Sequence, residues 1–372
     1  MFSSLPPKTM VLFGTRPEVI KLAPVIAELK RHKIPTVVVS SGQHIDLLKP
    51  LLRLFRVRPD YDLSVMRNNQ QPNVVCSKVL ARLDKIITAE SPHLILVQGD
   101  TTTTLAGAMA GFHRKIPVAH VEAGLRSGDP HNPFPEEMNR RLVTRLATLH
   151  FAATKLNRSN LCAEGVDPSQ IIVTGNTVVD ALSSIESKLI NSSRLPKVIS
   201  KTEGLKRIVV TTHRRENFGE SMLNNLRVLR DFVHDRSDTC ILFPMHPNPN
   251  VRRAVKEFNN AERIFLMEPL AYPQFINLLK KSWLIVSDSG GIQEEAPTLK
   301  KPLIVLRKNT ERPEAITAGT AKLADDSAVK LQTLLEETYY SNEWEQKLLS
   351  VRNPFGDGKA SQRIVEIIKN FR

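Results

Sequence analysis

Short runs of β-branched and other apolar residues recur along the chain, separated by longer segments whose apolar residues lie three and four positions apart. Unbroken apolar runs are typical of strands buried on both faces of a parallel sheet, and three-and-four spacing is typical of helices that cover it. The first half is therefore expected to consist of βαβ units. Its predicted strands are 10–13, 36–39, 94–97, 118–121, 150–153 and 171–173, and its clearest predicted helices are 18–31, 73–90 and 136–147.

The same alternation restarts after the polar, proline-containing segment 192–196. Strands are predicted there at 208–211, 240–243, 264–267, 284–286 and 303–306. A parallel sheet flanked by helices, repeated once, indicates an α/β protein with two doubly wound, Rossmann-like domains. We place the first domain at 1–180 and the second at 181–356.

Composition narrows the class of protein. The chain has 372 residues, 41% of them apolar and 24% charged, as in ordinary globular proteins. Its net charge of +14 predicts an anionic ligand or partner. A nucleic-acid-binding protein is the competitor from another class, but the basic residues are dispersed and only 5% of residues are aromatic, too few for base stacking. Examples of the dispersed basic residues are Arg140, Arg141, Arg145, Lys280 and Lys281.

The cysteines and the lengths of the apolar stretches indicate where in the cell the protein is expected. Cys76, Cys162 and Cys240 are odd in number and far apart, which favours reduced thiols in a cytoplasmic protein over a disulfide framework. No stretch has the length of a signal peptide's apolar region or of a membrane span. We therefore expect a cytoplasmic protein without membrane contact.

Polar and glycine-containing segments directly follow most of the predicted strands. Open parallel sheets bind ligands beyond the carboxyl ends of their strands, so such segments on two sheets suggest one cleft that both domains face. The segments are 14–18, 98–104, 122–126, 211–217, 245–250 and 287–291.

Ser289, Gly290 and Gly291 lie between a predicted strand and a predicted helix. Backbone N–H groups at such a helix start suit a diphosphate, although a serine cap with a glycine turn would look the same. Glu295, one turn further on, could accept both ribose hydroxyls or be a solvated helix residue. Arg16, Lys21 and Arg312 follow strands in the two halves, and three such cations favour an anionic substrate.

Three carboxylates follow neighbouring segments of the first half and could form an acid and base set: Asp100, Glu122 and Glu136. Asp100 could instead cap the helix after it, and Glu136 could be an ordinary first-turn acid. His213 could orient a phosphate or carry a proton, or be a hydrogen-bonded loop residue, whereas His246 is more typical of a structural role. No metal-ligand spacing occurs, so we assign no metal.

Neither the dinucleotide fingerprint nor the phosphate loop of ATP-binding proteins is present, so no cofactor is expected. The segments in their order instead resemble the non-hydrolysing UDP-N-acetylglucosamine 2-epimerases over nearly the whole chain, from about Gly14 to Gly358. The motifs that carry the resemblance are 14–18 (GTRPE), 99–104 (GDTTTT), 121–126 (VEAGLR), 135–140 (PEEMNR), 174–177 (TGNT), 213–216 (HRRE), 289–297 (SGGIQEEAP) and 310–314 (TERPE).

This resemblance implies a glycosyltransferase-B-like pair of domains, a homodimer, and a final helix at 357–372 that packs on the first domain. It implies reversible conversion of UDP-N-acetylglucosamine into UDP-N-acetylmannosamine for surface polysaccharides, through loss of UDP to a bound glycal and re-addition. The implied catalytic residues are Asp100, Glu122, Glu136 and His213. The implied UDP-binding residues are Arg16, Lys21, Phe275, Ser289, Gly290, Gly291, Glu295 and Arg312.

The chain departs from the family pattern at a few positions. Leu270 stands where some members have glutamine, so a uracil contact there must come from the backbone or be absent. Members that bind a second substrate molecule as activator use segments that correspond to 43–46 and 68–70, where Asp46 and Asn69 replace Gln and Arg. Activation is thus left open. Within the fold, a hydrolysing epimerase, an epimerase for a modified UDP-sugar and a glycosyltransferase are the alternatives.

Overall fold

The computed structural model describes residues 6–42, 45–65, 70–192, 198–214, 217–325 and 327–371. The chain divides into two compact units. Unit 1 comprises Met1–Ser184 and Phe355–Arg372, and unit 2 comprises Ile185–Pro354. The last segment of the chain therefore belongs to the unit built by the first half.

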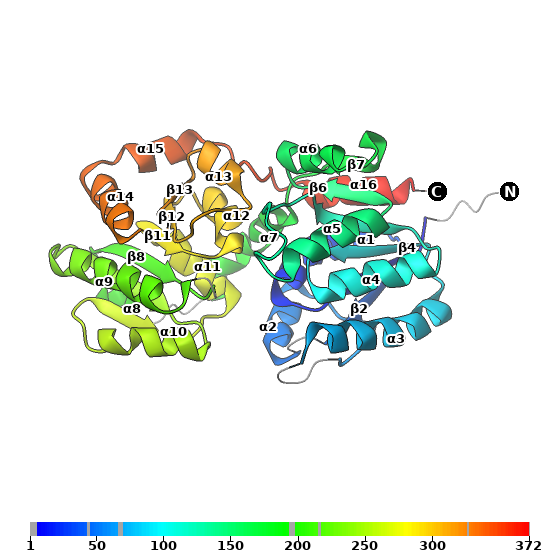
Figure 1. The fold of residues 1–372 in the computed structure, drawn as a ribbon, viewed down its shortest axis with the longest axis horizontal. Helices are drawn as coiled ribbons and strands as arrows, with labels where there is room; N and C mark the ends of the chain where they lie inside the picture. Colours follow the sequence, from blue (N-terminus) through cyan, green and yellow to red (C-terminus); the bar gives the residue numbers. More distant parts are fainter. Residues whose placement is uncertain are drawn as a thin grey trace. The chain divides into compact units, whose positions relative to one another are not determined.

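Unit 1 is built on a parallel sheet of seven strands in the order β3-β2-β1-β4-β5-β6-β7 (Figure 1). The order reverses direction between β1 and β4, which makes that point the topological switch of a doubly wound sheet. The strands are β1 (Thr9–Phe13), β2 (Thr36–Ser40), β3 (Tyr61–Asp62), β4 (Leu94–Gln98), β5 (Val118–Ala123), β6 (Leu149–Ala152) and β7 (Ile171–Val173).

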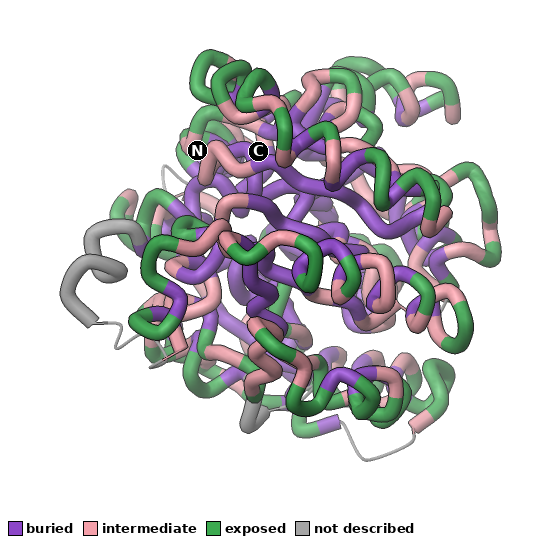
Figure 2. The backbone as a smooth tube through the Cα atoms, turned by 90° about the vertical axis from the view of Figure 1, so that its left-hand side faces the viewer, coloured by how far each residue is buried: buried purple, intermediate pink, exposed green. Residues whose placement is uncertain are grey.

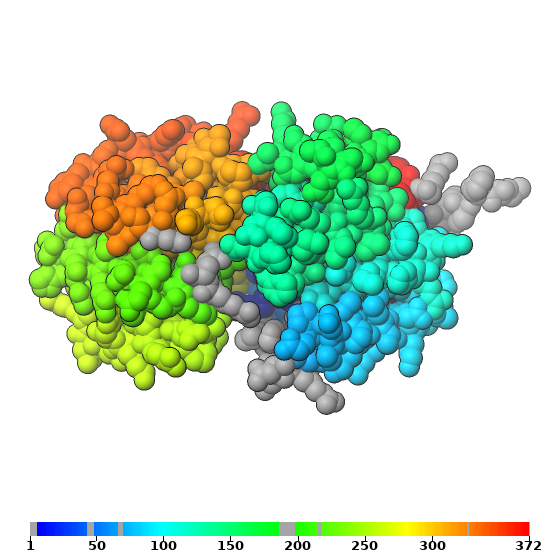
Figure 3. Space-filling view, viewed as in Figure 1, coloured from blue at the N-terminus to red at the C-terminus, as the bar shows by residue number. Residues whose placement is uncertain are grey.

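Helices cover both faces of this sheet, and the central strands are buried. Figure 2 draws buried residues in purple, viewed from the left-hand side of Figure 1. Helices α3, α4 and α5, blue to green, lie side by side on one face (Figures 1 and 3). The helices of unit 1 are α1 (Arg16–Arg31), α2 (Ile45–Phe55), α3 (Pro72–Glu90), α4 (Thr102–His113), α5 (Glu136–Leu146), α6 (Lys155–Ala163), α7 (Thr177–Ser192, which runs into unit 2) and α16 (Ala360–Lys369).

Unit 2 repeats this plan with a parallel sheet in the order β10-β9-β8-β11-β12-β13. Its strands are β8 (Lys206–Thr211), β9 (Thr239–Pro244), β10 (Ile264–Met267), β11 (Leu284–Ser287), β12 (Leu303–Val305) and β13 (Ala321–Leu323). Its helices are α8 (Val198–Lys201), α9 (Glu220–His234), α10 (Pro249–Ala254), α11 (Tyr272–Lys280), α12 (Gly290–Leu299), α13 (Pro313–Thr317), α14 (Ala328–Tyr340) and α15 (Glu343–Ser350).

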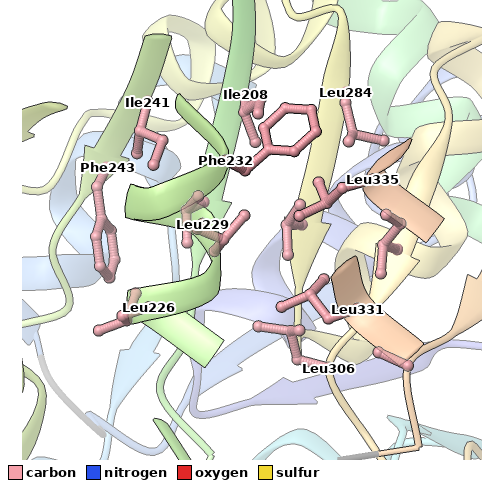
Figure 4. Close-up of a cluster of buried hydrophobic side chains, with 14 of the residues drawn as sticks. Ile208, Leu226, Leu229, Phe232, Ile241, Phe243, Leu284, Leu306, Leu331 and Leu335 are labelled. Carbon is pink, nitrogen blue, oxygen red and sulfur yellow. The ribbon is translucent and has the colours of Figure 1, made fainter. Parts of the chain in front are cut away.

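The core of unit 2 lies between its sheet and two of its helices. Leu229 of α9 and Leu335 of α14 are fully buried, and Figure 4 draws them beside the strand residues Ile208 and Leu284. Apolar side chains at three-and-four spacing on both helices face β-branched and leucine side chains of the strands, as the sequence pattern predicts.

The fold prediction is confirmed: the chain forms two doubly wound α/β units, each built on a parallel sheet. All eleven predicted strands are present, with ends shifted by no more than two residues. The pattern missed β3 and β13, which are strands of two and three residues at the sheet edges. Strands this short carry no periodic signal. No helix of the described residues is long and apolar enough to cross a membrane.

Glu18 joins the loops at the two sides of the switch point in unit 1. It is 1% exposed, and its carboxylate accepts the N–H groups of Gly14 and Thr15 at 2.9 and 2.6 Å. With Thr15 it forms a capping box at the start of α1. The hydroxyls of Thr101 and Thr104 also donate to it, at 2.8 and 3.1 Å. The loop after β1 and the loop after β4 are thus fixed to one carboxylate.

Asp180 anchors the last helix to unit 1. Its side chain, on α7, accepts the N–H groups of Ala360 and Ser361 at 3.2 and 2.8 Å and the Ser361 hydroxyl at 2.5 Å. Burial raises the pKa of Asp180, and these hydrogen bonds oppose the rise. A carboxylate at the first turn of α16 also interacts favourably with the helix dipole.

Replacing Asp180 by alanine should destabilise unit 1 by about 2–3 kcal/mol, because two buried N–H groups of α16 lose their acceptor. Urea unfolding should show a lower midpoint, and hydrogen exchange should accelerate in α16. Amides of α14 in unit 2 serve as the internal control. An unchanged midpoint with unchanged exchange in α16 would contradict this anchoring role.

Candidate active site

Asp100 lies at the carboxyl end of β4, directly after Gly99, whose φ of +75° makes the turn. Its carboxylate oxygen Oδ2 accepts Nε and Nη2 of Arg140 at 3.0 and 2.8 Å. Asn139 donates to the backbone oxygen of Asp100 at 2.8 Å. Thr101, not Asp100, caps α4, since its hydroxyl accepts the N–H of Thr104. The capping alternative for Asp100 was therefore wrong.

Glu122 lies on the neighbouring strand β5, where the register with β6 shifts between Val121 and Ala123. Its φ of +67° lies in the left-handed region, which costs an ordinary residue roughly 1–3 kcal/mol and is found most often at functional sites. Because Gln98 pairs with Val121, the ends of β4 and β5 bring Asp100 and Glu122 to one edge of the sheet.

Three donors surround the Glu122 carboxylate. Lys21 Nζ lies 2.5 Å from Oε1, Asn176 Nδ2 lies 3.4 Å from the same oxygen, and Gln98 Nε2 donates to Oε2. Both charged side chains are less than a tenth exposed. The pair is buried, so its charges are retained only because each is matched by the other and by amide hydrogen bonds.

Glu136, the third predicted carboxylate, is the first residue of α5 and is half-buried. The next turn of α5 carries Arg140, which contacts both Asp100 and the fully buried Glu137. Arg140 thus connects α5, which carries Glu136, to the loop that carries Asp100. Arg140, one of the basic residues dispersed along the sequence, is only 4% exposed, because its side chain forms buried ion pairs.

His120 contacts the loop that carries Asp100. It is fully buried on β5, and its Nε2 donates to the backbone oxygen of Gly99 at 2.7 Å. Burial lowers the pKa of His120 to about 3, so the ring is neutral at physiological pH. It fixes the turn before Asp100 without adding charge.

The predicted phosphate-binding segment lies at the start of α12, where Ser289 is the N-cap residue. Gly290 lies directly against Arg312: a side-chain carbon at Gly290 would stand 2.5 Å from Arg312 Nη1. Arg312 is 7% exposed, and its Nε donates to Glu294 of α12 at 2.6 Å. The structure therefore brings Gly290 and Arg312 together at one helix start, with the guanidinium held by a helix carboxylate.

Glu295 is 6% exposed, which excludes the alternative of a solvated helix residue. The hydroxyl of Tyr272, on α11, donates to its Oε1 at 2.8 Å. Burial and the charge of Glu295 raise the pKa of Tyr272 well above its usual value, so the phenol stays a donor. Phe275 lies on the same helix α11 and is half-buried, as is Leu270 in the loop before it.

His213 lies in the loop after β8, beside the segment that follows β11. Its Nδ1 is 3.2 Å from the Asp288 carboxylate, and its ring stacks on His246 with centroids 5.2 Å apart. Asp288 immediately precedes Ser289, so His213 and the phosphate-binding segment belong to one group of loops. His213 is thus a hydrogen-bonded loop residue, which does not exclude a role with phosphate.

Lys21 belongs to the carboxylate group of unit 1 through its ion pair with Glu122. Arg16, the first residue of α1, is exposed, and no contact described above joins it to either group. The activator-site positions Gln43, His44, Asn68 and Asn69 and the side chain of Asp46 lie outside the described residues. Within the described ranges, no three His, Cys, Asp or Glu side chains could jointly hold a metal ion.

Sequence reasoning missed the side chains that hold the predicted ones. Arg140 and Asn176 stand inside motifs noted for their order, which was the only signal for them. Gln98 is the last residue of a buried strand, where a polar side chain calls for a hydrogen-bonding role. Tyr272 carries no local signal.

Unit 1 offers two adjacent carboxylates: Asp100, which is paired with Arg140, and Glu122, which is paired with Lys21. Such carboxylates can exchange protons with a substrate carbon or oxygen. Unit 2 offers a helix start, an arginine and a histidine, which suit phosphate oxygens, and a buried carboxylate that suits hydroxyl groups.

The chain is similar to known proteins over most of its length. The family model described as UDP-N-acetylglucosamine 2-epimerase matches residues 27–369. The UDP-N-acetylglucosamine 2-epimerase of Bacillus subtilis is 43% identical over 361 residues, covering 96% of this chain and 94% of the relative. That of Escherichia coli K12 is 41% identical over 372 residues, covering 98% and 99%.

Solved structures are similar over the same length. The UDP-GlcNAc 2-epimerase of Neisseria meningitidis bound to UDP-GlcNAc has a TM-score of 0.91 at 40% identity and covers 97% of this chain and 99% of that chain. The Methanocaldococcus jannaschii enzyme in complex with UDP-GlcNAc and UDP has a TM-score of 0.84 at 34% identity, with coverage of 97% and 99%. The fold, the match to the family model and the full-length identity lead to one conclusion: the chain belongs to the UDP-N-acetylglucosamine 2-epimerase family, a family of isomerases.

Proposed function

We propose that this protein interconverts UDP-N-acetylglucosamine and UDP-N-acetylmannosamine. The observation that carries the proposal is the pair of carboxylates at the adjacent ends of β4 and β5, with Asp100 held by Arg140 and Glu122 by Lys21. The relatives of known structure bind UDP-GlcNAc and UDP, which supports the same substrate here. Surface polysaccharide synthesis is the proposed use of the product, by resemblance to bacterial members.

The UDP moiety is bound, in this proposal, by Ser289, Gly290 and Gly291 at the α12 start, with Glu295 on the ribose. The remaining proposed UDP contacts are Arg16, Lys21, Phe275, Arg312 and His213. Bare N–H groups and cations stabilise the negative charge of a diphosphate, most of all when it leaves. Lys21 already neutralises Glu122, so its contact with UDP would be shared with that carboxylate.

The chemistry requires bond breaking at C1 before C2 can react. The C2 hydrogen of the sugar is not acidic, because no carbonyl group adjoins it in the ring. When the C1–O bond breaks, its electron pair leaves on the diphosphate, and positive character at C1 makes the C2 hydrogen removable by a carboxylate. The intermediate is a glycal with UDP beside it. Proton return on the other face of C2 and re-addition of UDP at C1 give the epimer, and no external oxidant or reductant is consumed.

The three carboxylates differ in burial, which supports different catalytic roles for them. Asp100 has a quarter-exposed side chain and Glu136 is half-buried, so both can reach a substrate carbon. Glu122 is buried among Lys21, Gln98 and Asn176. We therefore assign the C2 proton to Asp100 and Glu136, and to Glu122 the support or relay of that proton.

A homodimer is proposed on the outer face formed by α4 and α5. Four large apolar side chains are exposed there: Phe112 at 57%, Phe134 at 66%, Met138 at 38% and Leu142 at 46%. Met138 and Leu142 are four residues apart and therefore lie on one side of α5, while Phe134 lies in the loop just before this helix. An apolar stripe of this kind on a globular domain is typical of a surface that pairs. A second copy of the chain is the proposed occupant.

Wild-type protein incubated with UDP-N-acetylglucosamine in D2O should yield UDP-N-acetylmannosamine with deuterium at C2, followed by proton NMR. Glu122→Gln should lower kcat by about 100-fold or more, since it removes the proton relay and leaves Lys21 without its carboxylate. Glu90→Gln is the matched control: Glu90 pairs with Lys8 at 2.5 Å at the opposite ends of the strands. Its turnover should stay within twofold.

Product identity separates the alternatives. Free N-acetylmannosamine would indicate a hydrolysing epimerase, and turnover only with a modified UDP-sugar would indicate another substrate. Oxygen-18 placed in the bridge between C1 and the diphosphate should scramble into the non-bridging positions during epimerisation. Inversion at C2 without such scrambling would rule out the elimination route.

Tyr272→Phe should weaken UDP-sugar binding without slowing the chemistry, because Tyr272 orients the Glu295 carboxylate proposed for the ribose. We expect KM to rise about fivefold, equivalent to roughly 1 kcal/mol for one hydrogen bond, with kcat within twofold. Tyr61→Phe removes a similar tyrosine–glutamate hydrogen bond, to Glu90 in unit 1. An equal rise in KM in both variants would remove Tyr272 from the ribose site.

Leu142→Arg should convert a dimer into a monomer, since a charge in the centre of an apolar interface cannot be solvated. Light scattering after size-exclusion chromatography should then give the chain mass of 41.8 kDa in place of twice that mass. Val329→Arg, at a 76% exposed position of α14, is the control and should leave the mass unchanged. Dimers that persist in Leu142→Arg would place the interface elsewhere.

A further inference from the structure

Asp288 of unit 2 is a carboxylate with many hydrogen-bond donors. It is fully buried and directly follows β11. Its Oδ2 accepts the Thr212 hydroxyl at 2.7 Å, the backbone N–H groups of His213 and Arg214 at 2.9 Å each, and the Asn217 amide at 3.0 Å. Four donors from one loop on a single oxygen fix that loop against the end of β11.

The second oxygen of Asp288 is directed to the His213 ring, with Oδ1 3.2 Å from Nδ1. Burial would raise the pKa of Asp288, but the hydrogen bonds from His213 and the loop outweigh it and lower the pKa to about 2. The acceptor is therefore a carboxylate throughout the physiological range. A carboxylate can only accept, so Nδ1 of His213 must carry a proton.

The ring plane of His213 is fixed by a second contact. His246 stacks on it with an interplanar angle of 22°, and His246 is itself held because its Nδ1 accepts the N–H of Asn248 at 3.2 Å. The His213 ring is thus set in direction by Asp288 and in plane by His246. Its Nε2 points away from Asp288 by the geometry of imidazole.

We propose that Asp288 is a positioning residue for His213: it holds the ring with Nδ1–H toward itself and presents Nε2 to the diphosphate of the substrate. The inference rests on the proposed function, in which His213 lies beside the diphosphate. Asp288 does not touch the substrate. It acts through the ring, as the orienting carboxylate does in an aspartate–histidine pair.

The proton balance of the leaving step follows. With Nδ1–H on Asp288, the imidazolium form of His213 carries its second proton on Nε2. As the C1–O bond breaks and its electron pair passes to the diphosphate, Nε2–H moves to a phosphate oxygen, leaving neutral His213 with its proton on Nδ1. Re-addition of UDP at C1 reverses the transfer.

The tautomer can be measured without substrate. Long-range ¹H–¹⁵N spectra of the deuterated, ¹⁵N-histidine-labelled protein distinguish protonated from bare ring nitrogens, and the resonance missing in His213→Gln assigns His213. In the neutral ring of wild-type protein, Nδ1 should be protonated and Nε2 bare. A bare Nδ1 in wild-type protein would overturn the proposal, whether or not the protein proves to be an epimerase.

Kinetics test whether Asp288 acts through His213. Asp288→Asn should lower kcat about 10-fold or more while KM changes less than about threefold, because the orientation of a proton-transfer group is lost. The double variant Asp288→Asn, His213→Gln should be no slower than His213→Gln alone, within about twofold. Losses that multiply in the double variant would show that Asp288 acts independently of His213, and would overturn the proposal.

Asp180→Asn supplies the matched control. Asp180 is also a buried carboxylate that accepts backbone N–H groups, but it anchors α16 in unit 1. It should leave both kcat and the His213 tautomer unchanged. A comparable kcat loss in Asp180→Asn would mean that general destabilisation explains the Asp288 variant, which would also overturn the proposal. Failure of wild-type protein to form UDP-N-acetylmannosamine would instead refute the proposed function.

Discussion

In each unit, one buried carboxylate connects the loops on the two sides of the topological switch point. In unit 1 it is Glu18, which stands after β1 and accepts the hydroxyls of Thr101 and Thr104 after β4. In unit 2 it is Asp288, which stands after β11 and accepts donors from the loop after β8. Because β8 and β11 occupy the places of β1 and β4 in the strand order, the two connections are topologically equivalent. A carboxylate removed from water is stable there only if donors from both loops converge on it, so the loops are held in one arrangement.

The two carboxylates, Glu18 and Asp288, differ in which groups they hold. Glu18 is occupied by hydroxyl and backbone donors and holds the loops that carry Arg16 and Asp100. Asp288 accepts most of the loop donors on Oδ2, while its Oδ1 faces both the backbone N–H and the ring of His213. In unit 1 a separate residue, Arg140, holds the carboxylate of Asp100, whereas in unit 2 the carboxylate that fixes the loop backbone also contacts the His213 ring.

The sequence predicted the sheets well because buried parallel strands are local signals: 171–173 and 264–267 were predicted to the residue. The candidate site was predictable only in part. Polar residues after strands, such as Asp100 and His213, follow from where open sheets bind ligands. The residues that hold these side chains could not be predicted in this way. Arg140 is 40 positions from Asp100 in the sequence, and Asp288 is 75 positions from His213. Such pairs are decided by packing between distant segments, for which the sequence pattern carries no local signal.

The buried pair of Lys21 and Glu122 illustrates why position and chemistry are coupled at this site. Two ions less than a tenth exposed gain little net stability, because their desolvation offsets most of their attraction. Glu122 also has a left-handed φ, which adds strain. A fold selected for stability alone would place an apolar pair there. Gln98 and Asn176 hold the carboxylate in this unfavourable setting, where a change in its protonation alters the energy of Lys21 directly. That coupling is what the proton relay proposed for Glu122 would require.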